Sequence, residues 1–147
     1  MKQLLYNRYV VLFSRFVIAF VFIFAALEKI SDPAAFSEAI VNYRIFPTYS
    51  VSMIAIVVPW IELVCGVLLL FGISTLENSY ILGSMLLFFI LIIAISIIRG
   101  LNIDCGCFGT HHAQAAGLSK ILENSIMLLL ALHIIFFGEH TGKIHII

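Results

Sequence analysis

Residues 80–98 read YILGSMLLFFILIIAISII and contain no charged side chain. A helix needs about 20 mostly apolar residues to cross the hydrocarbon core of a bilayer, so this stretch predicts a transmembrane helix. Three further stretches have the same character, although the last is purely apolar over too short a length and needs a polar first turn to span. The four predicted helices cover about residues 10–30, 51–73, 80–98 and 118–137.

The composition of the whole chain supports this assignment. Of its 147 residues, 63% are hydrophobic and 11% are charged, and the mean hydropathy is +1.15, far from the balance of a soluble domain. We therefore expect an all-α integral membrane protein, a four-transmembrane-helix bundle that forms one domain over residues 1–147. The net charge is zero and the basic residues form no run, so we expect contact with the lipid bilayer and none with nucleic acid.

Two longer connections separate the predicted helices. The first, residues 31–50, opens with Asp32-Pro33, which predicts a helix stop followed by a restart. Within it, residues 36–46 are suited to an amphipathic turn at the membrane interface. The second, residues 99–117, is called here the cysteine connection. An even number of crossings separates the two, so they are expected on the same side of the membrane, although the distribution of Lys and Arg does not decide which side.

The cysteine connection contains the motif Cys105-Gly106-Cys107. Two cysteines this close, with a glycine between them, can reach the α-carbon separation of about 4.4–6.8 Å that a disulfide requires. So small a ring is strained and easily reduced, which favours a pair that cycles between dithiol and disulfide. Positive charge stabilises a thiolate, whereas Asp104 opposes it at Cys105, so Cys107 is expected to be the more reactive thiol. The local positive candidates are Arg99, His111, His112 and Lys120.

Other interpretations of the motif stay open. Cys105, Cys107, His111 and His112 supply two thiolates and two imidazoles, a set that suits zinc or copper, although their spacing is compressed for a metal site. Inert packing is the third interpretation. It fits Cys65, which lies among apolar residues of a predicted helix, better than it fits a pair among Asp, Gly and His.

Arg15 and Glu62 are predicted deep in the membrane, where ionisable residues usually face the interior of a bundle. At about 1.5 Å per residue, each lies roughly 21 or 22 Å from the end of its helix nearest the cysteine connection. We therefore expect Arg15 and Glu62 to form an intramembrane polar pair, with a structural or a functional role. Lys29, beside Glu28 at the membrane edge, is expected to reach the interface or the cysteine connection.

Several segments together resemble the DoxX-like membrane proteins, and within them the MauE branch. They occur in the family's order, from about residue 10 to residue 109, and the last of them is the most specific. The matching segments are Arg15, Glu28-Lys29-Ile30 with Asp32-Pro33 and Phe36, Pro59-Trp60-Ile61-Glu62-Leu63 with Gly66, and Cys105-Gly106-Cys107-Phe108-Gly109.

The resemblance implies a bundle in a bacterial inner membrane, with the cysteine connection on the periplasmic side. It also implies thiol redox chemistry with a thioredoxin-like periplasmic partner, but it does not specify methylamine as the substrate.

The leading prediction is a membrane thiol-disulfide oxidoreductase in which Cys105 and Cys107 are catalytic. A quinone is a candidate cofactor that no residue specifies, and a metal is the alternative. The rival functions are copper or zinc binding and a non-enzymatic assembly factor for a periplasmic client. The side chains expected to support the cysteines are Arg99, His111, Lys29 and Glu28.

Overall fold

A computed structural model describes residues 7–100 and 118–138, and these form helices only. Four helices are long and apolar enough to cross a membrane, and a short fifth, α3, lies between the first two. The predicted all-α architecture with four spans is confirmed, and the short helix α3 overlaps the predicted interfacial turn. The helices are α2 (Arg8–Ser31), α3 (Pro33–Asn42), α4 (Thr48–Phe71), α5 (Thr75–Ile98) and α6 (Leu118–Gly138).

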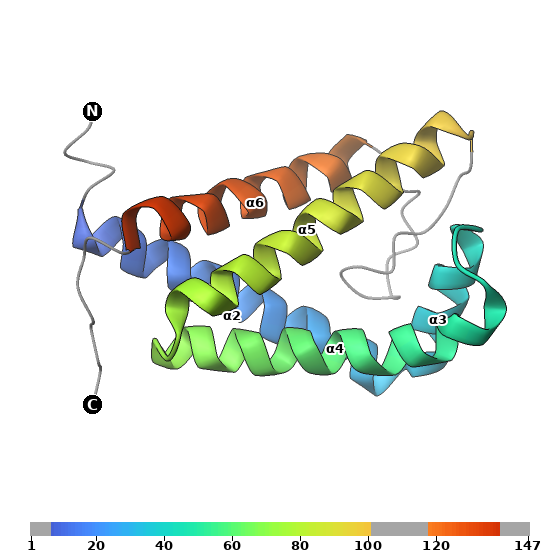
Figure 1. Ribbon diagram of the computed structural model, residues 1–147, viewed down its shortest axis with the longest axis horizontal. Helices are drawn as coiled ribbons and strands as arrows, with labels where there is room; N and C mark the ends of the chain where they lie inside the picture. The colour runs from blue at the N-terminus through green and yellow to red at the C-terminus, as the bar shows by residue number, and fades with distance from the viewer. Residues whose placement is uncertain (1–6, 101–117, 139–147) are drawn as a thin grey trace.

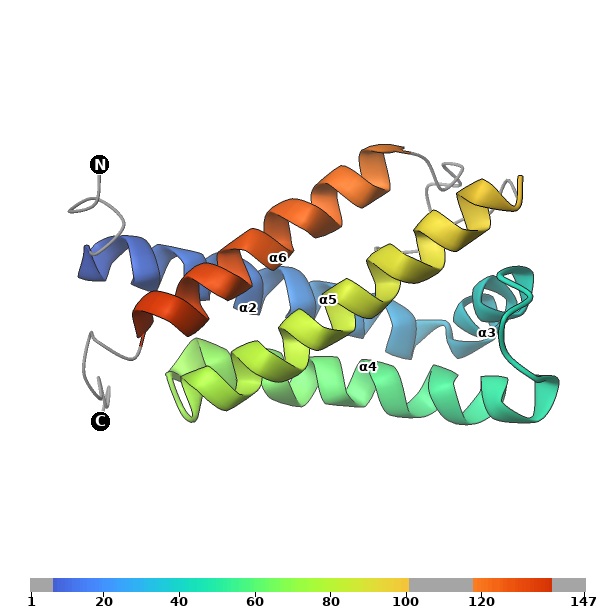
Figure 2. The ribbon, with the colours of Figure 1, turned by 45° about the horizontal axis from the view of Figure 1, so that its top comes forward.

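The four long helices form a closed bundle with α3 at one end (Figures 1 and 2). Helix α2 packs against α4 and α6, and α5 packs against the same two helices. Their shared interior holds one core in which each helix contributes fully buried side chains, among them Ile18, Leu69, Leu82 and Ile134. The outer faces are also apolar, as contact with lipid requires, with Phe13, Met53 and Leu129 largely exposed.

Helices α2 and α4 approach each other closely at Gly66. A Cβ atom at this position would lie 3.0 Å from Ile23 Cγ1 and 3.4 Å from the carbonyl oxygen of Ala19. Small residues allow such close contact between transmembrane helices, so Gly66 permits the packing of α4 on α2. Gly83 on α5 faces a looser contact, because its Cβ would lie 3.7 Å from Ala131 Cβ.

The stop and restart predicted at Asp32-Pro33 are confirmed. Helix α2 ends at Ser31, and the Asp32 carboxylate accepts a hydrogen bond of 3.0 Å from the Ala35 amide in the first turn of α3. Pro33 occupies the first position of α3, where its missing N–H costs nothing. This cap lets the chain change direction within one residue.

The predicted start of the third spanning helix at Tyr80 is wrong, because α5 begins at Thr75. The polar residues before Tyr80 are part of the helix, and they satisfy backbone groups at the turn. Asn78 Nδ2 donates hydrogen bonds to the carbonyl oxygens of Ile73, at 2.9 Å, and Ser74, at 3.0 Å. A polar run that appears to be a loop is therefore a first helical turn whose side chains cap the preceding turn.

Replacing glycine by alanine at two positions tests the close approach of α2 and α4. Gly83→Ala should raise the thermal unfolding midpoint in detergent, because alanine is better than glycine in a helix by about 0.5–1 kcal/mol and the new methyl group has room. Gly66→Ala should be less stable than Gly83→Ala by about 1 kcal/mol or more, because its methyl group presses on Ile23. Equal midpoints, measured by circular dichroism, would contradict this packing.

Candidate functional site

A buried ion pair joins α2 to α4 inside the bundle. Lys29 Nζ lies 2.8 Å from both carboxylate oxygens of Glu62. Lys29 is 4% exposed and Glu62 is 1% exposed, so neither group is solvated by bulk water. Each charge depends on the other, because an isolated charge is costly in so apolar an environment.

The predicted pair of Arg15 with Glu62 is wrong, since Glu62 bonds to Lys29. Arg15 precedes Lys29 by roughly 21 Å along α2, at about 1.5 Å per residue. Its side chain is buried, and its Nε and Nη2 atoms have no hydrogen-bond partner among residues 7–100 and 118–138. Its guanidinium carbon lies 5.4 Å from the centroid of the Phe16 ring. The prediction failed because it assumed that α2 and α4 end at the same level.

Helix α4 extends well beyond the end of α2. Glu62 lies about 21 Å from the Thr48 end of α4, whereas Lys29 lies about 3 Å from the Ser31 end of α2. The projecting part of α4 is covered by α3, whose Phe36 and Ile40 pack against Val51 and Ala55. Lys29 was expected at the membrane interface, and the cover provided by α3 is the reason that it is buried instead.

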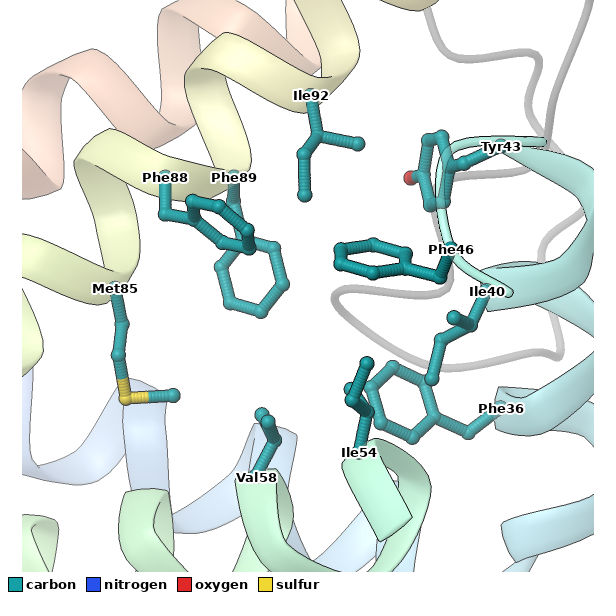
Figure 3. Close-up of a pocket in the computed structure, with 10 residues that line it drawn as sticks. All are labelled: Phe36, Ile40, Tyr43, Phe46, Ile54, Val58, Met85, Phe88, Phe89 and Ile92. Carbon is teal, nitrogen blue, oxygen red and sulfur yellow. The ribbon is translucent and has the colours of Figure 1, made fainter. Parts of the chain in front are cut away.

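Next to the ion pair, apolar side chains of α3, α4, α5 and the α3–α4 connection line a cavity of about 90 Å³ (Figure 3). Five of the lining residues are aromatic, and the Phe46 and Phe88 rings lie 6.1 Å apart between centroids. Phe88 is 51% exposed on the outer face of α5, so the wall of the cavity reaches the lipid-facing surface. We call this cavity the aromatic pocket; its lining is Phe36, Ile40, Tyr43, Phe46, Ile54, Val58, Met85, Phe88, Phe89 and Ile92.

Two aromatic rings contact Lys29 of the ion pair and also line the aromatic pocket. Lys29 Nζ lies 5.2 Å from the ring centroid of Phe36 and 5.4 Å from that of Phe89, within the range of cation–π attraction. Both rings also line the pocket. A positively charged hydrogen-bond donor is therefore held next to an otherwise apolar cavity.

The sequence did not reveal the aromatic pocket. Its residues come from three separate segments, 36–46, 54–58 and 85–92, and the last is far from the other two in the chain. Phenylalanines in a membrane protein are also more often lipid-facing than part of a site. The sequence signal that could have indicated the pocket is the density of aromatic side chains in residues 36–46, because an interfacial turn alone does not need them.

Two other predicted site residues, Glu28 and Arg99, lie in the described part of the chain. Glu28 is exposed. Arg99 follows the last turn of α5, and its Nη1 atom donates a hydrogen bond of 3.5 Å to the carbonyl oxygen of Arg44. The end of α5 therefore lies beside the α3–α4 connection. The predicted residues that lie outside the described part of the chain are Cys105, Cys107, His111 and His112.

No group of three His, Cys, Asp or Glu side chains suited to a metal ion occurs within residues 7–100 and 118–138. Cys65, which lies in the described part, is buried as a free thiol in the main core beside Ile18 and Leu69. That placement agrees with its expected packing role.

Comparison with known proteins gives consistent matches. The profile of the family described as methylamine utilisation protein MauE matches residues 7–137. The MauE protein of Paracoccus denitrificans is 31% identical over 82% of this chain and 65% of its own length. The corresponding values for the MauE protein of Methylorubrum extorquens are 31%, 73% and 58%.

A third relative, Protein TlpB of Flavobacterium psychrophilum, is 26% identical over 87% of this chain and 37% of its own length. The chain thus spans less than two thirds of the length of each of these relatives. No solved structure matches the chain.

A double-mutant cycle tests the buried ion pair. Lys29→Met or Glu62→Met alone leaves one charge buried without its partner, so each should lower the free energy of unfolding by roughly 3–5 kcal/mol. The double variant should recover most of that loss, because two apolar side chains of similar size fill the space without charge. Unfolding in mixed micelles with increasing dodecyl sulfate, followed by circular dichroism, measures these values.

The control is Glu123→Gln on α6. It removes the ion pair of Lys120 with Glu123, 3.1 Å apart, in which the Glu123 side chain is 52% exposed. That change should cost no more than about 1 kcal/mol. Losses at Lys29 and Glu62 that simply add in the double variant would show that the two residues do not act as a pair.

Proposed function

This chain belongs to the MauE family, and we propose that it is a thiol-disulfide oxidoreductase of the bacterial inner membrane. In this proposal Cys105 and Cys107 cycle between dithiol and disulfide and exchange with a thioredoxin-like protein of the periplasm. The observation that carries the proposal is the location of Cys105-Gly106-Cys107 in the connection between two spanning helices. A reactive pair in that location meets a soluble partner at the membrane surface while its helices stay in contact with lipid-soluble molecules.

The helix ends support this arrangement. Helices α5 and α6 are antiparallel, with Gly83 beside Ala131 and Gly138 near Leu76. The cysteine connection therefore starts and finishes at the end of the bundle that carries α3. The contact of Arg99 with the Arg44 carbonyl joins that end of α5 to the α3–α4 connection.

The exchange balances without a further reagent. A thiolate of the reduced protein attacks the disulfide of the partner and forms a mixed disulfide, and the second thiolate then displaces the partner. Cys105 and Cys107 lose two electrons and two protons and become a disulfide, while the partner gains two thiols. The reverse direction uses the same steps.

Arg99, His111 and Glu28 are the side chains that we propose to support the cysteines. Positive charge on Arg99 or His111 favours the thiolate, the reactive form. Lys29 does not suit this role, because Glu62 engages its ammonium group in the bundle. The process named for the curated relatives is methylamine utilisation, and it is the setting in which we propose to seek the client of this chain.

Thiol trapping in intact cells tests the redox cycle. Rapid acidification followed by an alkylating reagent should show the Cys105/Cys107 pair in both oxidised and reduced forms, and the balance should shift when the partner is deleted. Cys107→Ser should abolish oxidation of the partner. Cys105→Ser should accumulate a mixed disulfide through Cys107, because Cys107 is the thiol expected to attack and Cys105 the one that resolves the intermediate. Cys65→Ser is the matched control and should change neither result, because Cys65 is buried in the core.

Three outcomes would replace the proposal. A pair that never changes redox state, with partner oxidation intact in Cys107→Ser, ends it. Stoichiometric zinc or copper in the purified protein, lost on Cys105→Ser, would identify a metal-binding protein with Cys105, Cys107, His111 and His112 as candidate ligands. Full function of the double variant Cys105→Ser, Cys107→Ser would identify a non-enzymatic assembly factor.

The proposed topology has its own test. A membrane-impermeant maleimide added to intact spheroplasts should label the reduced cysteine connection in a Cys65→Ser background, because the connection is proposed to face the periplasm. A protein with its only cysteine at position 2, made by Lys2→Cys with all native cysteines replaced, should be labelled only after lysis. Three spans, an odd number, lie between residues 2 and 105 and place them on opposite faces of the membrane. Labelling of Cys105 only after lysis would reverse the orientation.

A further inference from the structure

The aromatic pocket is suited to an alkyl chain. Its lining is aliphatic or aromatic apart from the hydroxyl of Tyr43, and none of the lining residues named above is charged (Figure 3). An alkyl chain has no polar group that needs a partner, so such a wall satisfies it fully. Phe88 both lines the pocket and is half exposed on the outer face of α5, so the pocket is continuous with the surface that lipid covers. The molecules that meet this pocket are therefore the lipids of the bilayer.

Two exposed arginines lie at the end of the pocket that faces the membrane surface. Arg44 follows Tyr43 of the pocket lining in the α3–α4 connection, and Arg99 follows the last turn of α5. Arg99 Nη1 donates its hydrogen bond of 3.5 Å to the carbonyl oxygen of Arg44, so its guanidinium group lies against the backbone of Arg44. Neither arginine forms an ion pair with an acidic side chain of residues 7–100 and 118–138. Two positive side chains therefore extend from neighbouring points of the protein.

The depth of the pocket below these arginines matches the dimensions of a phospholipid. The headgroup layer of one leaflet is roughly 5–7 Å thick, because a bilayer of about 40–45 Å has a hydrocarbon core of about 30 Å. Arg99 comes directly after a spanning helix, and Ile92 of the pocket lies about 10 Å deeper along α5, at about 1.5 Å per residue. A phosphate at the level of Arg99 therefore has acyl-chain carbons at the level of the pocket.

We propose that the aromatic pocket holds one acyl chain of an anionic phospholipid whose phosphate is bound by Arg44 and Arg99. The planar guanidinium group matches the oxygens of a phosphate and binds them with charge-assisted hydrogen bonds. A zwitterionic lipid offers the same phosphate but adds a cation that the two arginines repel, so the site selects a headgroup with net negative charge. This site goes beyond the proposed redox function, and lipid binding does not depend on Cys105 or Cys107.

Native mass spectrometry of the purified full chain, titrated with lipid in a mild detergent, tests the assignment. The two lipids compared are dioleoyl phosphatidylglycerol, which is anionic, and dioleoyl phosphatidylcholine, which has the same chains and no net charge. The first phosphatidylglycerol should bind with a Kd about tenfold or more below that of phosphatidylcholine, because it alone keeps its net charge beside both arginines. Glycerophosphoglycerol, the same headgroup without acyl chains, should not displace it.

The double variant Arg44→Asn, Arg99→Gln tests the headgroup contacts. Asparagine tolerates the positive φ of 51° at position 44, and glutamine keeps an N–H donor at position 99, so the fold should be retained. The preference for phosphatidylglycerol should fall to about twofold or less. The matched control is Arg8→Gln, which removes an exposed arginine at the start of α2, at the opposite end of the bundle, and should leave the preference unchanged.

A second pair of variants tests the place of the acyl chain. Val58→Phe fills the cavity and should weaken the binding of both lipids about tenfold or more, because the chain loses its apolar contacts. Val57→Phe, at a residue that is 46% exposed on the outer face of α4, is the matched control and should change neither Kd. Met85→Phe narrows the pocket from α5 and replaces Val58→Phe if that variant does not fold.

Three results would overturn the assignment: equal affinity of the native chain for the two lipids, equal loss of preference in Arg8→Gln and in the double arginine variant, or equal effects of Val57→Phe and Val58→Phe. Displacement by glycerophosphoglycerol would also overturn it, since the site would then bind a headgroup alone. A dimer in the same spectra that is lost in Val58→Phe would assign the pocket to a second copy of the chain.

The failure of this inference is distinguishable from the failure of the proposed function. The double variant Cys105→Ser, Cys107→Ser should bind phosphatidylglycerol as the native chain does. Lost lipid preference with active cysteines would therefore remove only the lipid site, and intact lipid binding with inert cysteines would remove only the redox function.

Discussion

The ion pair of Lys29 with Glu62 sets the packing on which the rest of the structure depends. Within lipid the two charges are stable only together, so the helices that carry them must be aligned wherever the pair can form. This condition brings the last turn of α2 to the middle of α4. Gly66, one turn further along α4, then lies against Ala19 and Ile23, so the close approach of the two helices and the ion pair require the same alignment.

That alignment has a structural consequence at the end of the bundle that carries α3. Because α4 projects beyond α2, part of its apolar surface needs a cover, and α3 supplies it through Phe36 and Ile40. The Asp32 cap makes the required change of direction possible immediately after α2. The aromatic pocket forms where this cover meets α5, and it is therefore a product of the offset between α2 and α4.

The same end of the bundle concentrates the features that bear on function. The ion pair, the aromatic pocket and the contact of Arg99 with Arg44 all occur on the side where α3 lies. The end of α5 and the start of α6, which the cysteine connection joins, both lie at that end of the bundle. Arg15, in contrast, lies toward the other end of α2, so the two buried basic residues of this helix belong to different environments.

Much of the architecture could be predicted from the sequence, because the cost of placing polar backbone and charge in lipid acts locally. The uncharged run ending at Ile98 specifies a spanning helix wherever it lies, and Asp32-Pro33 specifies a helix stop from two neighbouring residues. The start of α5 was misplaced because the turn-capping role of Asn78 depends on backbone groups that are exposed only once the turn has formed.

What the sequence by itself determined is thus the set of spanning helices, the presence of buried charges and the Cys105-Gly106-Cys107 motif. Only the tertiary structure decided which charges meet. Depth along a helix can be counted from residues, but the offset between two helices depends on how their surfaces fit, here on Gly66 and on the cover provided by α3. For that reason Glu62 pairs with Lys29 rather than Arg15, and the aromatic pocket appears only in the folded bundle.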